Sequence, residues 1–232
     1  MAKKQFFAII DTETTIADTV ADIGIIIVDR AGVIHNQMAV IIKNEFENNE
    51  LFYDKNAKGL WSLEYAALKR ANYVKMLESG TRSLASVNAV NLWVQKAIGK
   101  YNPTLTAYNL AFDTAKCRNT GIDLNGFSDR FCLWASAVGN ICKGKAYKQF
   151  CLENHLFNNV TEFGNMTFKT SAESVTGYLN GIMTQEPHTA LEDAIDYELP
   201  ILKKILAKKN WKEKILPYNW HDFQVKDNFV AK

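Results

Sequence analysis

Three predicted strands near the start of the chain constrain the fold more than any other feature. Residues 6–10 are an apolar run that predicts the first strand, residues 23–28 are a second such run, and residues 33–42 predict the third strand. The second run is rich in β-branched side chains, which favour strands. Residues 29–32, Asp-Arg-Ala-Gly, form a turn signal between the second and third strands. We therefore expect these two strands to pair as an antiparallel hairpin.

After these strands the sequence alternates between strand and helix patterns. Residues 104–108, which follow Pro103, predict a fourth strand, and a helical pattern resumes from Leu110. Residues 128–133 predict a short fifth strand. Further helices are predicted over residues 83–99, 145–156, 171–179 and 189–209, the last with a kink or restart at Pro200. The order of strands and helices is typical of an α/β protein.

The composition narrows the class of protein. The 232 residues fit one large domain, and we place it at residues 1–208 with a C-terminal tail at residues 209–232. Lys and Arg number 27 against 25 Asp and Glu, so the net charge of +2 carries no strongly basic signature of nucleic-acid binding. The four cysteines form no CxxC pair and predict free thiols in a reducing, cytoplasmic compartment. No apolar stretch reaches the roughly 18 residues of a membrane helix, so no membrane partner is expected.

Two carboxylates follow the first predicted strand. Asp11 and Glu13 are two residues apart, and side chains at that spacing project to the same side of an extended chain. They would emerge together at the carboxyl end of a buried strand. The alternative is a solvated strand end, or a turn capped by Asp11.

A further acidic residue, Asp113, lies where the fourth strand leads into a helix. If Asn109 caps this helix, Asp113 falls in its first turn. The helix dipole would then lower the pKa of the Asp113 carboxyl. An acid in this place is also typical of an ordinary capped helix.

The segment His188-Thr-Ala-Leu-Glu-Asp193 matches a capping box, in which Thr189 is the N-cap and Glu192 the third helical residue. The residue before the cap and the fourth helical residue then meet, as in a hydrophobic staple. Here these residues are His188 and Asp193, so we expect an imidazole beside a carboxylate that also lies in a first helical turn. A lone histidine on the surface or in the core is the alternative.

Taken together, the three segments resemble the three motifs of the DEDDh (DnaQ-like) 3′-to-5′ exonucleases. They occur in the family's order, and His188 stands where the related DEDDy branch has tyrosine. The segment Asp22-Ile23-Gly24 is also similar to the family's second strand. The resemblance covers residues 5–208 and implies an RNase H-like α/β fold. That fold is a five-stranded mixed sheet with strands one to three antiparallel, strands four and five parallel to strand one, and helices on both faces.

The resemblance also implies a site. Its four metal-binding carboxylates would be Asp11, Glu13, Asp113 and Asp193, and His188 would be the general base. The cofactors would be two divalent cations, Mg²⁺ or Mn²⁺. The candidate substrate contacts are Thr14, Thr15, Asn109, Phe112 and Lys148, the last in the basic segment 143–148.

Physical chemistry supports such a site independently. Four converging carboxylates repel one another, and divalent cations relieve the repulsion. Oxygen ligands suit hard ions such as Mg²⁺ and Mn²⁺ and not zinc. Two such ions can clamp the attacking and leaving oxygens of a phosphodiester displacement, while a neutral imidazole takes the proton of the attacking water.

The expected activity is 3′-to-5′ hydrolysis of single-stranded nucleic acid to nucleoside 5′-monophosphates, with DNA favoured over RNA. Three alternatives stay open: an RNA-processing or oligoribonuclease-type exoribonuclease, an RNase H-like endonuclease, and a binding module or proofreading subunit that docks on a polymerase. The tail, residues 209–232, is a candidate docking segment, and a homodimer is a further possibility. Among the aromatic residues, Tyr108 and Trp134 lie near the predicted site, whereas packing roles are expected for Trp61, Trp93, Trp211 and Trp220.

Overall fold

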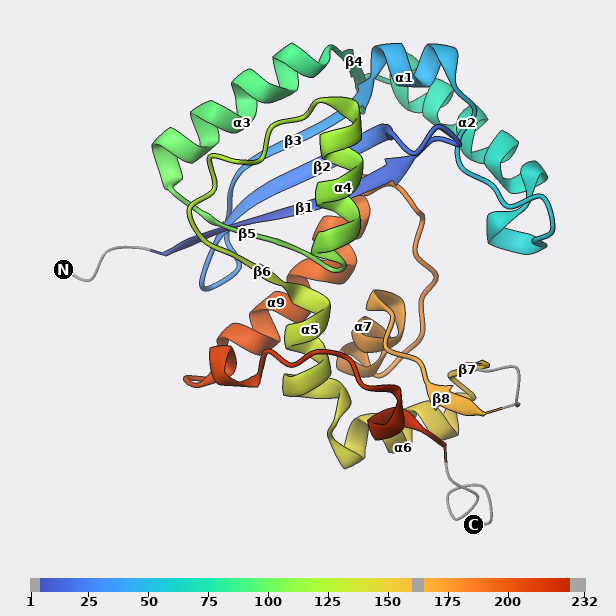
Figure 1. Cartoon of the computed structure of the whole chain (residues 1–232), viewed down its shortest axis with the longest axis vertical. Helices are drawn as coiled ribbons and strands as arrows, with labels where there is room; N and C mark the ends of the chain where they lie inside the picture. The colour runs from blue at the N-terminus through green and yellow to red at the C-terminus, as the bar shows by residue number, and fades with distance from the viewer. Residues whose placement is uncertain (1–4, 160–164, 226–232) are drawn as a thin grey trace.

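A six-stranded mixed sheet forms the centre of the protein, as a computed structural model that describes residues 5–159 and 165–225 shows (Figure 1). The order across the sheet is β4-β3-β2-β1-β5-β6. Its strands are β1 (Phe6–Thr14), β2 (Val20–Asp29), β3 (Ile34–Ile42), β4 (Ser83–Ala85), β5 (Thr104–Ala107) and β6 (Arg130–Cys132). The chain is therefore an α/β protein, as its sequence pattern predicts.

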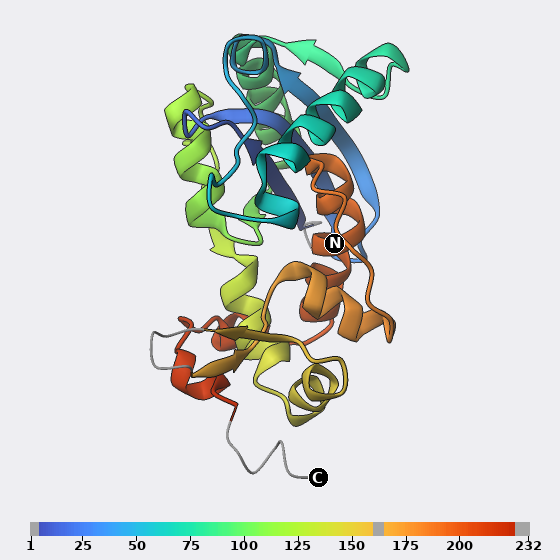
Figure 2. The same ribbon diagram turned by 90° about the vertical axis from the view of Figure 1, so that its right-hand side faces the viewer.

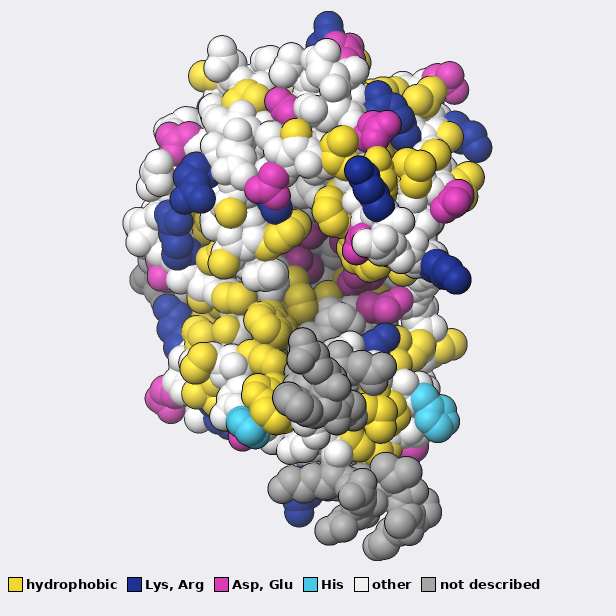
Figure 3. All heavy atoms as spheres, turned by 45° about the vertical axis from the view of Figure 1, so that its right-hand side comes forward, with side chains coloured by type: hydrophobic (Ala, Val, Ile, Leu, Met, Phe, Trp, Pro, Cys, Tyr) yellow, Lys and Arg dark blue, Asp and Glu magenta, His cyan; other side chains and the backbone are white. Residues whose placement is uncertain are grey.

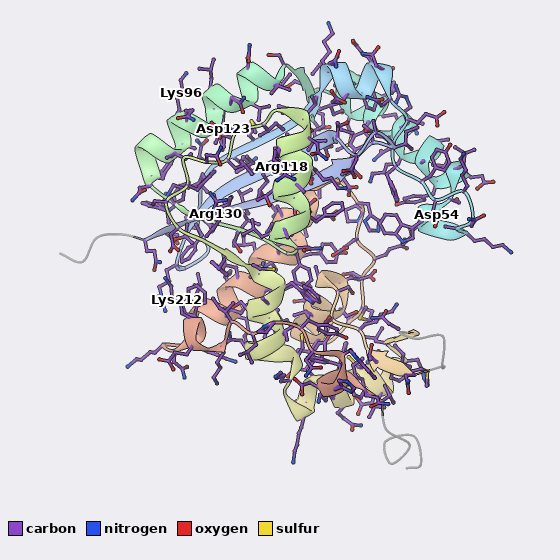
Figure 4. The ribbon with its side chains drawn as sticks, in the orientation of Figure 1. Asp54, Lys96, Arg118, Asp123, Arg130 and Lys212 are labelled. Carbon is purple, nitrogen blue, oxygen red and sulfur yellow. The ribbon has the colours of Figure 1, made fainter. Side chains whose placement is uncertain are left out.

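The strand directions match the prediction. Strands β1, β2 and β3 pair antiparallel, and Gly32 adopts the left-handed conformation (φ +83°) in the turn between β2 and β3. Strand β5 is parallel to β1, and β6 is parallel to β5. Arg130 begins β6, and its guanidinium donates to the carbonyl groups of Leu124 and Phe127 (Figure 4).

The predicted number of five strands is wrong, because β4 adds a sixth strand parallel to β3. The helix expected from residue 83 instead begins at Val87, as α3 (Val87–Tyr101). Ser86 is its N-cap, and the Ser86 hydroxyl accepts from the Ala89 N–H. Residues 83–85 are left extended at the edge of the sheet. A strand of three residues is too short to show the alternation that identifies strands in a sequence.

Helices cover both faces of the sheet (Figure 1). Alternate residues of β1 point to opposite faces, as the pleat of a strand requires. Ala8 and Ile10 pack with α3 and with α4 (Leu110–Thr120). Phe7 and Ile9 pack in a second cluster with α5 (Leu133–Ala137), α7 (Ala172–Asn180) and α9 (Leu199–Leu206). Beyond one end of the sheet lie α1 (Lys43–Asn48) and α2 (Leu63–Glu78).

A smaller group of elements lies beyond α5 and α7 (Figure 2). It contains α6 (Lys145–Glu153), the hairpin of β7 (Phe157–Asn159) and β8 (Met166–Phe168), and residues 209–225. Trp211 and Phe223 from this last segment are buried in the cluster that also contains Phe7 and Ile9. The described part of the tail therefore packs on the rest of the chain, whereas residues 226–232 lie outside the described residues. The boundary at residue 208 stays a prediction.

The helix predicted over residues 189–209 is divided into three parts. It begins as α8 (Ala190–Asp193), continues as a π-helical turn (Ala194–Glu198) and ends as α9 (Leu199–Leu206). Pro200 is the second residue after the π-helical turn, and a proline has no N–H and clashes with the carbonyl one turn before it. The predicted irregularity at Pro200 therefore takes the form of a π-helical turn, a feature often found at functional sites.

Two further expectations concern the cysteines and membrane-spanning helices. All four cysteines are free, as predicted. No helix among the described residues is both long and apolar enough to cross a membrane.

Candidate active site

A cavity of about 530 Å³ opens where β1 ends, between α4 and the chain that leads into α8. On the face shown in Figure 3, acidic side chains lie within the corresponding hollow. Six carboxylates line the cavity: Asp11, Glu13, Asp113, Glu186, Asp193 and Glu198. Four of them are the predicted metal-binding residues, so the fold brings these four together. His188 lines the same cavity.

Asp11 and Glu13 project from β1 to the same side, as their spacing predicts. The Glu13 carboxylate forms an ion pair with the Lys69 ammonium from α2, with 2.5 Å between Oε2 and Nζ. Burial raises the pKa of Glu13, and Lys69 opposes this rise. The pKa of Asp11 is raised well above its usual range, first by burial and then by the negative charge of Glu198. Among the described residues, no hydrogen-bond donor or cationic side chain offsets the charge of Asp11.

Asp113 lies in the first turn of α4, after the N-cap Asn109, as predicted. The Asn109 side chain makes no capping hydrogen bond. Instead, the Thr12 hydroxyl donates to Asp113 Oδ1 at 2.8 Å and links β1 to α4. The expected lowering of the Asp113 pKa by the helix dipole is wrong. Burial raises this pKa to about 7, because removing a charge from water costs more than the dipole returns.

The start of α8 brings His188 and Asp193 together. Thr189 is the N-cap, as predicted, although its side chain makes no capping hydrogen bond. The potential ligand atoms of Glu13, His188 and Asp193 all lie within 4.8 Å of one another. Burial raises the pKa of Asp193 to about 9, with Glu13 as the next cause, so the dipole expectation is wrong here too. A cation bound by these three residues would relieve the repulsion between the Glu13 and Asp193 carboxylates.

His188 adopts a left-handed backbone conformation (φ +54°), which is uncommon for a residue other than glycine. Residues held in such a conformation cluster at functional sites. Burial lowers the pKa of His188, and the positive charge of Lys69 lowers it further, so the neutral imidazole is favoured near pH 7. The Trp61 ring lies 5.7 Å from the His188 ring between centroids. Trp61 is 51% exposed and lines the cavity, so its predicted packing role is wrong.

A buried ionic network outside the cavity fixes the start of α8. The Asp22 carboxylate accepts from the Ala190 N–H at 3.0 Å, from the Tyr73 hydroxyl at 3.1 Å and from Arg82 Nε at 3.3 Å. Arg82 also pairs with Glu192 on α8. Next to Asp22, Gly24 allows close approach, since a Cβ there would lie 2.5 Å from the Ala190 backbone. The network therefore fixes the position of Ala190, which is two residues after His188.

The predicted substrate contacts divide into two groups. Thr14, Asn109 and Phe112 line the cavity, and Phe112 is 42% exposed. Thr15 does not line it, because its hydroxyl is turned to Thr19. Lys148 does not line it either: its ammonium group donates to the Asp222 carbonyl and lies over the Phe223 ring in the smaller group of elements.

Several residues of the cavity were missed by sequence reasoning, namely Thr12, Phe52, Lys116, Glu186 and Glu198. Thr12 lies between Asp11 and Glu13, and on the alternation of a strand it should face the opposite side. Lys116 lies one turn after Phe112, with its ammonium 4.5 Å from the centre of the Phe112 ring. The i, i+4 spacing on a predicted helix was the signal for this pair.

The donor set fits divalent cations of the hard type. Among the described residues, Asp193 Oδ1 and Glu198 Oε2 are buried without a hydrogen-bond partner. Leaving a buried carboxylate oxygen unpaired is costly, and a cation is one of the few partners that offset the cost. Carboxylate oxygens are the preferred ligands of Mg²⁺ and Mn²⁺. The arrangement can therefore bind cations and place a neutral imidazole beside them.

No protein-family model matches the chain, and no curated protein matches it significantly.

Proposed function

We propose that this protein is a 3′-to-5′ exonuclease with an RNase H-like fold that depends on two divalent cations, Mg²⁺ or Mn²⁺, and resembles the DEDDh family. The observation that carries the proposal is the convergence of Asp11, Glu13, Asp113 and Asp193 with His188 on one cavity. These residues come from three segments far apart in the sequence. Each segment has an ordinary structural explanation by itself, but their common position in one cavity does not.

The four carboxylates would hold the cations. Bound divalent cations would supply Lewis-acid stabilisation of the phosphodiester oxygens. Thr12 holds Asp113 through its hydroxyl, and Lys69 holds Glu13 through an ion pair. His188, neutral near pH 7, would accept the proton of the attacking water.

Exposed aromatic rings around the cavity suit the bases of a single strand. Phe112 projects from α4, and Phe52 and Trp61 lie edge to face, 6.1 Å apart between centroids. Base stacking on aromatic rings is tolerant of sequence. The Lys116 ammonium lies over the Phe112 ring and pairs with Asp18, and it offers a positive charge to a phosphate group. The cavity volume lies within the range of about 300–1,000 Å³ typical of ligand sites.

The test is degradation of a single-stranded DNA oligomer, labelled at either its 5′ or its 3′ end, with Mn²⁺ or Mg²⁺. We expect nucleotides to be lost from the 3′ end, and a closed circular strand to stay intact. Asp11→Asn should lower the rate by roughly 1,000-fold, since several kcal/mol of charge stabilisation disappears. His188→Asn should lower it by about 100- to 10,000-fold. Asp196→Asn, on the exposed side of the same helix as Asp193, is the matched control.

Absence of degradation by the wild-type protein, or equal rates with Asp11→Asn, would contradict the proposal. Cutting of the circular strand would point to an endonuclease. A matched RNA oligomer in the same assay separates the favoured DNA substrate from the RNA alternative, because the same carboxylates serve both and the sugar is read by other contacts.

A further inference from the structure

Glu198 is one of two carboxylates of the cavity that lie outside the three motifs, and Glu186 is the other. Glu198 ends the π-helical turn Ala194–Glu198 and is only 2% exposed. A buried carboxylate needs partners, because an isolated charge in the protein interior is strongly unfavourable. The surroundings of Glu198 therefore show which of its oxygens has a partner within the protein and which is available to a ligand.

The π-helical turn brings Glu198 to the side of the helix that carries Asp193. Glu198 is five positions after Asp193 in the sequence. In an α-helix, with about 100° per residue, this spacing would place the two side chains about 140° apart. In a π-helical turn, the i to i+5 hydrogen bonds bring residues at this spacing close to the same face. Both residues line the cavity.

The two carboxylate oxygens of Glu198 have different environments. Oε1 accepts from the backbone N–H of Tyr108, with 3.0 Å between the atoms, and this contact anchors the side chain to the end of β5. Oε2 is buried without a hydrogen-bond partner among the described residues. The protein thus fixes the position of the carboxylate and leaves one oxygen available to the cavity.

Charge interactions place Glu198 in the same cluster as two predicted metal-binding residues. Among the charges that raise the pKa of Asp11, that of Glu198 has the largest effect. Asp113 has the largest such effect on Glu198. All three carboxylates line the same cavity. Among the described residues, no cationic side chain opposes the rise of the Glu198 pKa.

We propose that Glu198 is a fifth carboxylate of the divalent-cation centre, with its unpaired Oε2 directed to the cations. The inference rests on the proposed function, and it adds a residue that none of the three motifs contains. A purely structural role, as an acceptor for the Tyr108 N–H, is the competing explanation.

Glu198→Gln separates the two explanations. A glutamine side-chain oxygen can still accept from the Tyr108 N–H, but the amide lacks the negative charge of the second oxygen. Binding of Mn²⁺ alone to the full-length protein is measured by electron paramagnetic resonance and isothermal titration calorimetry. Glu213→Gln, an exposed change, is the matched control, and Asp113→Asn tests the centre itself. Circular dichroism and melting without metal check the folding of every variant.

We expect Glu198→Gln to fold and to weaken Mn²⁺ binding about 10- to 100-fold, while Glu213→Gln binds as the wild type does. If Asp113→Asn weakens binding and Glu198→Gln binds as the wild type does, the role of Glu198 is overturned and the proposed function stands. If the wild-type protein binds no Mn²⁺, both proposals are overturned. If Glu198→Gln does not fold, Glu198→Asp replaces it: the shorter acid keeps its charge, and unchanged Mn²⁺ affinity would again overturn the proposal.

Discussion

Asp22 and Asp193 are both buried carboxylates near the start of α8, and their surroundings differ in one respect. Asp22 meets a cation, Arg82, a phenol hydroxyl and a backbone N–H. Asp193 has one oxygen without a hydrogen-bond partner among the described residues. Burial raises the pKa of Asp22 to about 6 despite these partners, and that of Asp193 to about 9.

The difference distinguishes a carboxylate that stabilises the fold from carboxylates that are suited to binding a ligand. The charge of Asp22 is compensated within the chain, so Asp22 can hold α8 against β2. The carboxylates of the cavity are charged groups for which the chain supplies little compensation, apart from Lys69 at Glu13. Such an arrangement destabilises the metal-free protein and suits a ligand with positive charge.

The largest effect is expected from removing the cation that faces Asp22. Arg82 is 3% exposed, and Arg82→Met would leave the buried Asp22 charge without its partner. The free energy of unfolding should fall by about 3–5 kcal/mol, measured by denaturant titration. The double variant Asp22→Asn/Arg82→Met should recover part of this loss. Arg118→Met, on the exposed part of α4, is the control and should change stability little (Figure 4). Equal losses in both arginine variants would argue against a compensated pair.

The second effect is a fall in the stability of the metal-free protein as the pH rises. The folded-state pKa is raised to about 7 for Asp113 and for Glu186, and to about 9 for Asp193, above the values of the unfolded chain. The folded state then retains protons that the unfolded state has lost, so stability falls as the pH rises above the unfolded-state pKa of about 4. The fall ends near pH 7 for Asp113 and Glu186 and near pH 9 for Asp193, so Asp193 accounts for the loss between pH 7 and 9. Melting followed by circular dichroism in a chelator should give a lower Tm at pH 9 than at pH 7. Mn²⁺ should restore Tm most at the higher pH, and a Tm independent of pH would contradict the uncompensated cluster.

The third prediction concerns the contact between β2 and α8. Gly24→Ala places a methyl group 2.5 Å from the Ala190 backbone, so one of the two elements must shift. We expect a loss of about 1–3 kcal/mol in the free energy of unfolding. In Gly99→Ala the new methyl group meets no atom within 4 Å, and this change within α3 should stabilise the protein by about 0.5–1 kcal/mol. Stability unchanged by Gly24→Ala would show that the contact is not close.

The smallest effect is expected from Asp193→Asn without metal. At pH 8 the folded protein keeps the Asp193 carboxyl protonated, whereas the unfolded chain ionises it. The neutral asparagine removes this cost and should raise the free energy of unfolding by about 1 kcal/mol, although the same change should abolish the proposed activity. The matched control is Asp196→Asn, whose side chain is exposed. Denaturant titration in a chelator provides the measurement. A loss of stability in Asp193→Asn would indicate that Asp193 has a structural partner, as Asp22 does.

Some of the site could be predicted because its signals are local. Asp11 and Glu13 are two residues apart on a strand, and Asp113 lies in a helix's first turn, so strand alternation and helix starts place them. His188 and Asp193 meet because of the geometry of one helix start. Lys148 could not be judged in this way, because its distance from the cavity depends on how the smaller group of elements packs.

The sequence by itself determined the hairpin of β2 and β3 and the positions of the motif residues at the ends of their elements, whereas the directions of the other strands were expected from the family resemblance. These features depend on side-chain alternation and on turn and helix-start residues, whose effects extend over a few positions. Only the tertiary structure decided that β4 joins the sheet, that Trp61 faces His188 and that Asp22 pairs with Arg82. It also decided that burial outweighs the helix dipole at Asp113, and that a π-helical turn brings Glu198 into the cavity. The physical reason is that desolvation and long-range pairing depend on which segments surround a side chain, and no local pattern records those neighbours.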